Sequence, residues 1–343
     1  MITEYYFSKL DKDKKAAYYA MLEGFGNLKS SFMVPRLEGS ELFDVHFLLR
    51  LDHPELFYSK GIKYKYYENS SQVEVVPEYL FDKKKIKSHQ QAISSRINKI
   101  TREAQNMSEE EKLKYIHDFL CESVYYDKLK KQYSHEIIGP LTQGVGVCEG
   151  IAKSVKILAD HLGLWCTVAI SEANPEKGVK YRHAWNIVRV NRKYYHIDVT
   201  FDNSLGKHES QSAEKRYDYF MLSDEQIFKD HQNLVWPVPK CEDGDSFYYK
   251  KKKMSFTKME DVRKRSLQAV KKGKILTFHW RGGGINKSIT DEIVKIAEEE
   301  AMKKGKHCKV AINPYQAIVR ISFENHIVPE NLVMEDADEG NHE

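Results

Sequence analysis

Apolar residues recur at helical spacing in two long stretches of the chain. One runs from Ile86 to Val124 and contains a capping box that starts at Ser108. The other runs from Cys148 to about Leu162, and Gly163 stands where a helix commonly ends. Residues 11–24 predict a shorter helix near the beginning of the sequence.

Alternation of apolar and polar residues, which is typical of strands, marks other segments. These segments are residues 43–50, 62–76 (a strand or a hairpin), 165–171, 184–190 and 193–200. Asn191 and Arg192 stand where a short hairpin turn would join the last two strands. The fold class predicted from this mixture is α+β, with the helix that bears Cys148 packed on an antiparallel sheet.

These elements divide the chain into five segments. We expect an N-terminal mixed α+β region (1–85), a core with its helical lead-in (86–236), a linker (237–256), a small C-terminal α/β domain (257–328) and an acidic, disordered tail (329–343). Prolines, an acidic cluster and the run Lys250–Lys253 indicate the linker. The helices and strands expected after it are sufficient for a separate small unit.

Composition narrows the classes of partner. The 54 basic and 50 acidic residues leave a net charge of only +4, which does not favour a nucleic-acid partner. No segment approaches the roughly 20 apolar residues of a membrane span. The N-terminal sequence also lacks the apolar stretch of a signal peptide. We therefore expect a cytoplasmic protein, or an exported one if a leader has been removed.

The metal-binding residue types form no recognisable motif. The 5 cysteines are scattered without a C-x-x-C pair, and the 14 histidines lack H-E-x-x-H or a comparable spacing. We expect neither a disulfide framework nor a metal nor another cofactor. A reducing compartment fits this cysteine usage best.

Cys148 is the first candidate for chemistry. It follows two glycines and begins a predicted helix, where the helix dipole and unpaired backbone N–H groups favour the thiolate. The thiolate is the nucleophilic form of cysteine. The helix alone fits an inert core cysteine as well, because Cys148 shares one apolar face with Ile151, Val155 and Leu158.

The predicted hairpin supplies an imidazole and a carboxylate. If Val190 pairs with Lys193, alternation places His183 and Asp198 on one face as diagonal neighbours, with Trp185 and His196 beside them. His183 would then take the proton of the thiol. Asp198 would orient the imidazole and stabilise its charged form. This set of groups is much harder to attribute to packing than any one of them alone.

Three further residues are weaker candidates for oxyanion or substrate binding. The Gln143 side-chain amide could complement the backbone N–H of Cys148 at an oxyanion, or could simply cap a turn. Trp185 could contact substrate or pack against the imidazole. His196 could act as a second imidazole or be a structural strand residue.

The segments GVGVCEGIAKSVKILADHLGLWC and RHAWNIVRVNRKYYHIDVTFD resemble the core of the transglutaminase-like superfamily. The family's catalytic cysteine, the histidine of its "HAW" strand and the aspartate of its "DVT" strand match Cys148, His183 and Asp198. The strong likeness covers about Tyr115 to Asp202. It implies a papain-like or transglutaminase-like core.

The resemblance also implies an activity. It implies a thiol enzyme that acts on protein or peptide amides through a Cys148 thioester, which either water or an amine could resolve. The first outcome makes a peptidase or amidase, the second a protein cross-linking acyltransferase. The alternative is a non-catalytic interaction or scaffolding module, because some members of the superfamily use the fold in that way.

Overall fold

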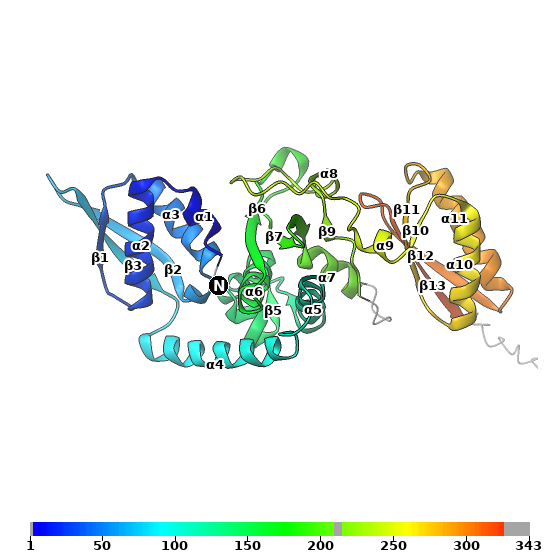
Figure 1. Cartoon of the computed structure of the whole chain (residues 1–343), viewed down its shortest axis with the longest axis horizontal. Coiled ribbons are helices and arrows are strands. Elements are labelled where there is room, and N and C mark those ends of the chain that lie inside the picture. Colours follow the sequence, from blue (N-terminus) through cyan, green and yellow to red (C-terminus); the bar gives the residue numbers. More distant parts are fainter. Residues whose placement is uncertain (1–2, 209–214, 326–343) are drawn as a thin grey trace, which may run out of the picture. The chain divides into compact units, whose positions relative to one another are not determined.

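The computed structural model describes residues 3–208 and 215–325. The chain divides into two compact units, Met1–Lys251 and Lys252–Glu343. Helices and mainly antiparallel strands occur together in each unit (Figure 1), which confirms the predicted α+β class. No helix in the described part of the chain is long and apolar enough to cross a membrane.

The first unit starts with helices packed against a three-stranded antiparallel sheet of order β1-β3-β2 (Figure 1). Its elements are α1 (Tyr5–Lys9), α2 (Lys12–Gly26), β1 (Phe32–Pro35), α3 (Gly39–Asp52), η1 (Pro54–Leu56), β2 (Ser59–Tyr66) and β3 (Gln72–Tyr79). Asp11 caps α2 by accepting a hydrogen bond from the Lys14 N–H at 2.9 Å. The helix predicted over residues 11–24 and the hairpin predicted over 62–76 are thereby confirmed.

The strand predicted over residues 43–50 is wrong, because this segment lies inside helix α3. A capping box between Glu38 and Glu41 starts the helix just before the segment. Buried residues lie on more than one side of α3, among them Leu48, Leu49 and Leu51. Such a helix has no simple apolar stripe, so its sequence can imitate the alternation of a strand.

The central part of the first unit holds the predicted helical lead-in. Its helices and short strands are α4 (Lys83–Arg102), α5 (Glu109–Ser123), β4 (Tyr125–Tyr126), η2 (Gln132–His135), η3 (Gly139–Gln143), β5 (Val145–Gly146) and α6 (Cys148–His161). The Ser108 side chain caps α5 as predicted. Gly163 follows α6 with φ at 74°, a conformation that glycine adopts readily. Most of α6 is buried, and it packs on β6 and β7.

A four-stranded antiparallel sheet of order β6-β7-β8-β9 carries the hairpin. Its elements and the helices that follow them are β6 (Trp165–Ile170), η4 (Pro175–Lys177), β7 (Ala184–Val190), β8 (Lys193–Ile197), α7 (Val199–His208), β9 (Phe220–Leu222), α8 (Asp224–Ile227) and α9 (Tyr248–Lys251). Val190 pairs with Lys193, which confirms the predicted register. Asn191 and Arg192 form the turn with φ of 51° and 67°.

The last predicted strand of the hairpin is too long. β8 ends at Ile197, and residues 199 and 200, which were expected in the strand, begin helix α7 instead. Asp198 explains the change, because its Oδ1 accepts a hydrogen bond from the Phe201 N–H at 3.0 Å and so caps the helix. Residues 237–251, expected in a linker, belong to the first unit, where Cys241, Phe247 and Tyr249 are buried.

The second unit is a four-stranded sheet of order β10-β11-β13-β12 with two helices packed against it (Figure 1). Its elements are β10 (Ser255–Phe256), α10 (Met259–Lys272), β11 (Leu276–Trp280), α11 (Lys287–Met302), β12 (Lys306–Asn313) and β13 (Ile318–Asn325). Phe278, Ile293 and Val319 are fully buried in its own hydrophobic cluster. The acidic tail predicted over 329–343 lies outside the described residues.

Candidate active site

Cys148 is the first residue of α6 and is partly buried. Strand β5 leads directly into it, and Tyr126 pairs with Gly146 just before it. Gly150, in the first turn of α6, lies so close to the Ser134 carbonyl that a side-chain Cβ would overlap the oxygen. The start of the helix therefore approaches neighbouring backbone closely, and the thiol sits at the positive end of the helix dipole.

Buried charges tie this turn of α6 to the N-terminal region. The Lys153 ammonium lies 2.9 Å from Glu136 Oε2 and 2.8 Å from Glu149 Oε1. Arg50, on α3, pairs with Glu136. Each of these charges thus has an opposite charge beside it. Removing any one partner would leave a charge unpaired. The network holds the residue next to Cys148 in place.

His183 immediately precedes β7, and its Nε2 lies 2.5 Å from Asp198 Oδ2. The Cys148 thiol lies close enough to the imidazole to affect its pKa. Burial would lower the pKa of His183, but the charge and hydrogen bond of Asp198, with a smaller contribution from Cys148, raise it to about 10. Because Nε2 faces the carboxylate, Nδ1 is the nitrogen left for the thiol.

Asp198 is fully buried between β8 and α7. Its Oδ1 caps α7, so the carboxylate is held by backbone as well as by imidazole. Burial would raise the pKa of Asp198, yet the neighbouring His183 and His231 hold it well below its usual range. The carboxylate therefore stays ionised across the neutral pH range.

His231 is a residue of this site that the sequence did not indicate. Its Nε2 lies 2.9 Å from Asp198 Oδ2, and its Nδ1 lies 2.7 Å from Asp230 Oδ1. The Tyr219 hydroxyl donates to Asp230 Oδ2 at 2.5 Å. Burial lowers the pKa of His231, but its two carboxylate partners outweigh burial and raise it. His231 lies in an irregular segment with no motif around it, so no local pattern could have identified it.

Trp185 and His196 lie behind the imidazole. The Trp185 ring stacks on His183 at 5.8 Å and is 1% exposed. Its indole N–H donates to His196 Nδ1 at 2.9 Å, and His196 Nε2 lies 2.7 Å from Asp224 Oδ1. Both residues are buried, so their position favours support of His183 over contact with substrate.

Gln143 ends the η3 segment, and its side chain is exposed. Its amide donates to the Thr142 hydroxyl at 3.3 Å. Among the described residues no hydrogen bond joins this amide to Cys148, so its role at an oxyanion stays a prediction.

Within the described part of the chain, two groups of side chains have the donor types of a metal site. One is His183, Asp198 and His231; the other is His196, Asp224 and Cys241. In the second group the Trp185 N–H donates to His196 Nδ1, so the neutral ring carries its proton on Nε2 and donates to Asp224. In the first group both imidazoles contact the carboxylate directly. A metal would have to break these hydrogen bonds, so the arrangement favours ion pairing.

Tyr126, in β4, lies near the thiol. Burial raises the pKa of Tyr126 to about 12, and the Cys148 charge contributes to the rise. The Lys130 ammonium lies 3.7 Å from the centre of the Tyr181 ring and so joins the loop after β4 to the segment before β7. Tyr125 and Tyr181 are 64% and 67% exposed.

Residues 94–199 match the family model described as the transglutaminase-like superfamily. This match contains Cys148, His183 and Asp198. No curated protein matches the chain in the corresponding comparison.

Several solved structures resemble parts of the chain. A crystal structure of a transglutaminase (TGase) shares 14% identity over 46% of this chain and 47% of its own, with a TM-score of 0.29. A candidate cysteine protease from Cytophaga hutchinsonii shares 14% identity over 41% and 61%, with a TM-score of 0.27. A candidate protease from Parabacteroides distasonis shares 12% identity over 40% and 36%, with a TM-score of 0.23. The chain thus spans less than two thirds of each of these structures.

Proposed function

We infer that this chain, whose residues 94–199 belong to the transglutaminase-like superfamily, is a thiol enzyme that opens protein or peptide amides through a thioester on Cys148. The observation that carries the proposal is the line of groups from the thiol through His183 to Asp198, with 2.5 Å between Nε2 and Oδ2. A thiol at the start of a helix, a base and a carboxylate that orients the base are the parts that thiol acyl transfer requires.

The chemistry proceeds in two halves. His183 takes the Cys148 proton, and the thiolate sulfur attacks the amide carbonyl carbon to form a C–S bond. The backbone N–H of Cys148 is placed to stabilise the oxyanion. His183 then gives its proton to the amide nitrogen, the C–N bond breaks, and an amine leaves. Water or a second amine attacks the thioester, restores the thiol and releases an acid or a new amide.

Asp198 explains the protonation state of His183 before substrate binds. With the His183 pKa raised to about 10, the imidazole is charged at neutral pH. A charged imidazole beside a thiol favours the thiolate. The charged imidazole therefore stabilises the thiolate that attacks the carbonyl carbon.

The test is the rate at which iodoacetamide alkylates each cysteine between pH 5 and 9, read by mass spectrometry. We expect Cys148 to react fastest and to keep reacting well below pH 8, because the charged imidazole favours the thiolate. A free cysteine, with a pKa of about 8.5, reacts slowly there because it is mostly protonated. His183→Ala removes this advantage. The direct control is Cys148 in the urea-unfolded chain, which has the same residue without the imidazole.

Cys121 is a second control within the folded chain. Its Sγ also lies near an imidazole, 3.7 Å from His117 Nε2, but it stands in the last turn of α5, at the negative end of that helix. Cys241 is buried and so is a poor comparison. Equal rates for Cys148 in the folded and unfolded chain at pH 6 would end the proposal. Peptides containing Gln, with and without a Lys peptide, then separate hydrolysis from cross-linking.

A further inference from the structure

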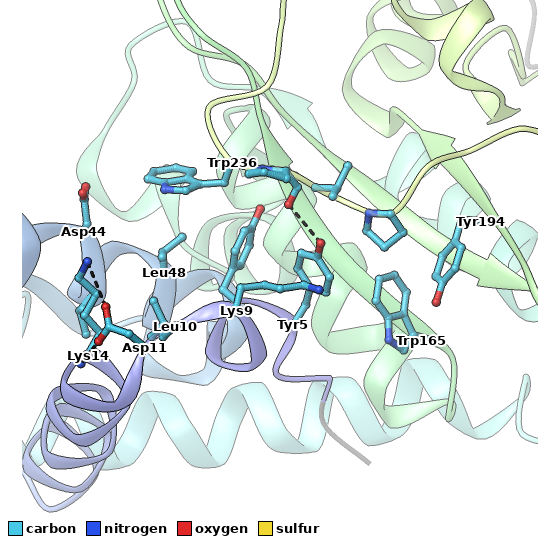
Figure 2. A pocket seen from close by; sticks show the side chains of 15 residues that line it. Tyr5, Lys9, Leu10, Asp11, Lys14, Asp44, Leu48, Trp165, Tyr194 and Trp236 are labelled. Carbon is cyan, nitrogen blue, oxygen red and sulfur yellow. Dashed lines mark hydrogen bonds and ion pairs between the residues drawn. The ribbon is translucent and has the colours of Figure 1, made fainter.

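An open cavity of about 840 Å³ lies between the N-terminal helices and the core sheet of the first unit (Figure 2). Its walls come from α1, α2 and α3, from β6 and β8, and from residues 236–239. Its volume is within the roughly 300–1,000 Å³ of ligand-binding pockets. Cys148, His183 and Asp198 are not among the residues that line it, so it is a site apart from the thiol.

Five of the fifteen residues that line the cavity are aromatic. The Trp165 ring lies edge-to-face with Tyr194 at 5.0 Å and with Tyr5 at 5.8 Å. Tyr6 and Trp236 form another edge-to-face pair at 6.3 Å. Apart from Tyr6, these rings are partly exposed rather than buried. Rings held by one another in this way offer rigid apolar surface, which binds a ligand at little entropic cost.

The polar groups of the walls are mostly neutral donors. The structure shows no protein partner, among its described residues, for the indole N–H groups of Trp165 and Trp236 or for the Tyr194 hydroxyl. An indole N–H can only donate, so a ligand must bring acceptors. Charged side chains of both signs, Lys9 and Asp44 among them, also contribute to the lining, so no net charge selects the ligand.

The chain itself shows one such contact at this cavity. The Tyr5 hydroxyl donates to the carbonyl oxygen of Pro237 at 3.1 Å, and the segment from Pro237 to Pro239 forms part of the wall (Figure 2). A proline-rich segment presents carbonyl acceptors and flat pyrrolidine rings, and its prolines have no N–H to satisfy. Aromatic-lined sites bind such segments in many proteins.

We propose that this aromatic cavity binds a proline-rich segment of a polypeptide. The ligand's rings pack on Trp165 and Tyr194, and its carbonyl groups accept from the unpartnered indole and phenol donors. An oligosaccharide also stacks on aromatic rings, but its many hydroxyl donors need acceptors within the walls. The carboxylates that line the cavity, Asp11 and Asp44, are both exposed, and Asp11 already pairs with Lys14.

The cavity adjoins the surroundings of the thiol. Trp236 stacks on Phe47 at 5.4 Å, and the Arg182 guanidinium lies 5.9 Å from its ring. Arg182 directly precedes His183, and Cys148 and Trp236 pack against the same hydrophobic cluster. The cavity and Cys148 therefore border the same hydrophobic cluster. The claim that the bound segment is part of the substrate rests on the proposed function. The claim that the cavity binds such a segment does not.

The test is a titration of the full chain with a ten-residue polyproline peptide, followed by tryptophan fluorescence and calorimetry. We expect saturable binding, none with a ten-residue Gly-Ser peptide, and at least tenfold weaker binding in Trp165→Leu and in Tyr194→Leu. The matched control is Tyr19→Leu, because Tyr19 is an aromatic residue of α2 that is 52% exposed and outside the cavity. Circular dichroism shows whether each variant is folded.

Three results would overturn the proposal: no saturable binding of polyproline, equal binding of the Gly-Ser peptide, or unchanged affinity in both folded cavity variants. Saturable binding of maltohexaose without binding of polyproline would do the same and assign the cavity to carbohydrate. Cys148→Ala is expected to bind polyproline as well as the parent. Alkylation of Cys148 measured on the parent protein reports the proposed function separately, so either idea can fail alone.

Discussion

At the scale of single residues, the candidate site is distinguished by two imidazoles that share one carboxylate oxygen. His183 and His231 both contact Asp198 Oδ2, at 2.5 and 2.9 Å. Asp230 holds the far side of His231 at 2.7 Å. Because Asp198 also caps α7, its carboxylate has little freedom to rotate away from His183. His231 is therefore best described as a positioning residue that fixes the carboxylate.

This role predicts a graded effect of substitutions at His231. His231→Leu removes the N–H facing Asp198, and we expect the alkylation rate of Cys148 at pH 6 to fall about tenfold, the equivalent of one pKa unit. His231→Gln keeps an N–H donor and is expected to retain more of the rate. His161→Gln is the control, because His161 is exposed at the end of α6 and contacts only the Ile157 carbonyl among the described residues. Equal rates in the folded Leu variant and the parent would contradict the role.

At the scale of elements, the placement of Cys148 depends on how closely the start of α6 approaches its neighbours. Gly150 permits contact with the Ser134 backbone, and the Val147 N–H donates to the same carbonyl at 3.0 Å. Lys153 and its two carboxylate partners hold the next turn. Helix propensity alone would start a helix here, but it would not place the thiol beside His183.

Gly150→Ala is therefore expected to destabilise the first unit by about 1–3 kcal/mol, the usual cost of overpacking, because backbone atoms cannot move aside easily. Gly26→Ala is the matched control, since nothing lies near a Cβ at that helical position. There the change is expected to be neutral or stabilising by up to about 1 kcal/mol. Urea unfolding followed by circular dichroism measures both, and a neutral Gly150→Ala variant would show that the turn is free to shift.

At the scale of the whole molecule, every residue of the candidate site lies in the first unit, together with the aromatic cavity. The free energy of unfolding of that unit should therefore depend on pH through the ion pair between His183 and Asp198. His183 has a pKa raised from 6.5 to about 10, so its contribution is fully present below pH 6.5 and is lost as pH rises through 10. Asp198 has a lowered pKa, so its contribution is present above its unfolded value and is lost in acid.

The prediction is made in a Cys148→Ala background, which removes the titration of the thiol. We expect His183→Asn to destabilise this background most below pH 6.5 and progressively less as pH rises through the His183 pKa, which Asp198 still raises, with a slope of up to about 1.4 kcal/mol per pH unit. Because other titrating groups are common to both proteins, the difference between them isolates His183. Urea unfolding at pH 6, 8 and 10 measures it. A difference that does not vary with pH would contradict the raised pKa.

The sequence by itself determined the features that depend on neighbouring residues. Asp11 and Ser108 mark helix starts because a cap acts on N–H groups two or three residues away. Asn191 and Arg192 close the hairpin because the turn sets the register of the strands on either side. The same register predicts that His183 and Asp198 are neighbours, because alternation from the turn outward puts both on one face.

Tertiary structure decided the features that join distant segments. Residues 43–50 alternate like a strand, yet burial on more than one side and a capping box make them a helix. His231 reaches Asp198 from a segment far along the chain, and the aromatic cavity combines helices α1 to α3 with strands of the core and residues 236–239. No local pattern encodes such contacts, because they depend on how the elements pack. The sequence thus indicated the thiol, the base, the carboxylate and the strand residues Trp185 and His196, whereas packing alone supplied His231 and the aromatic cavity.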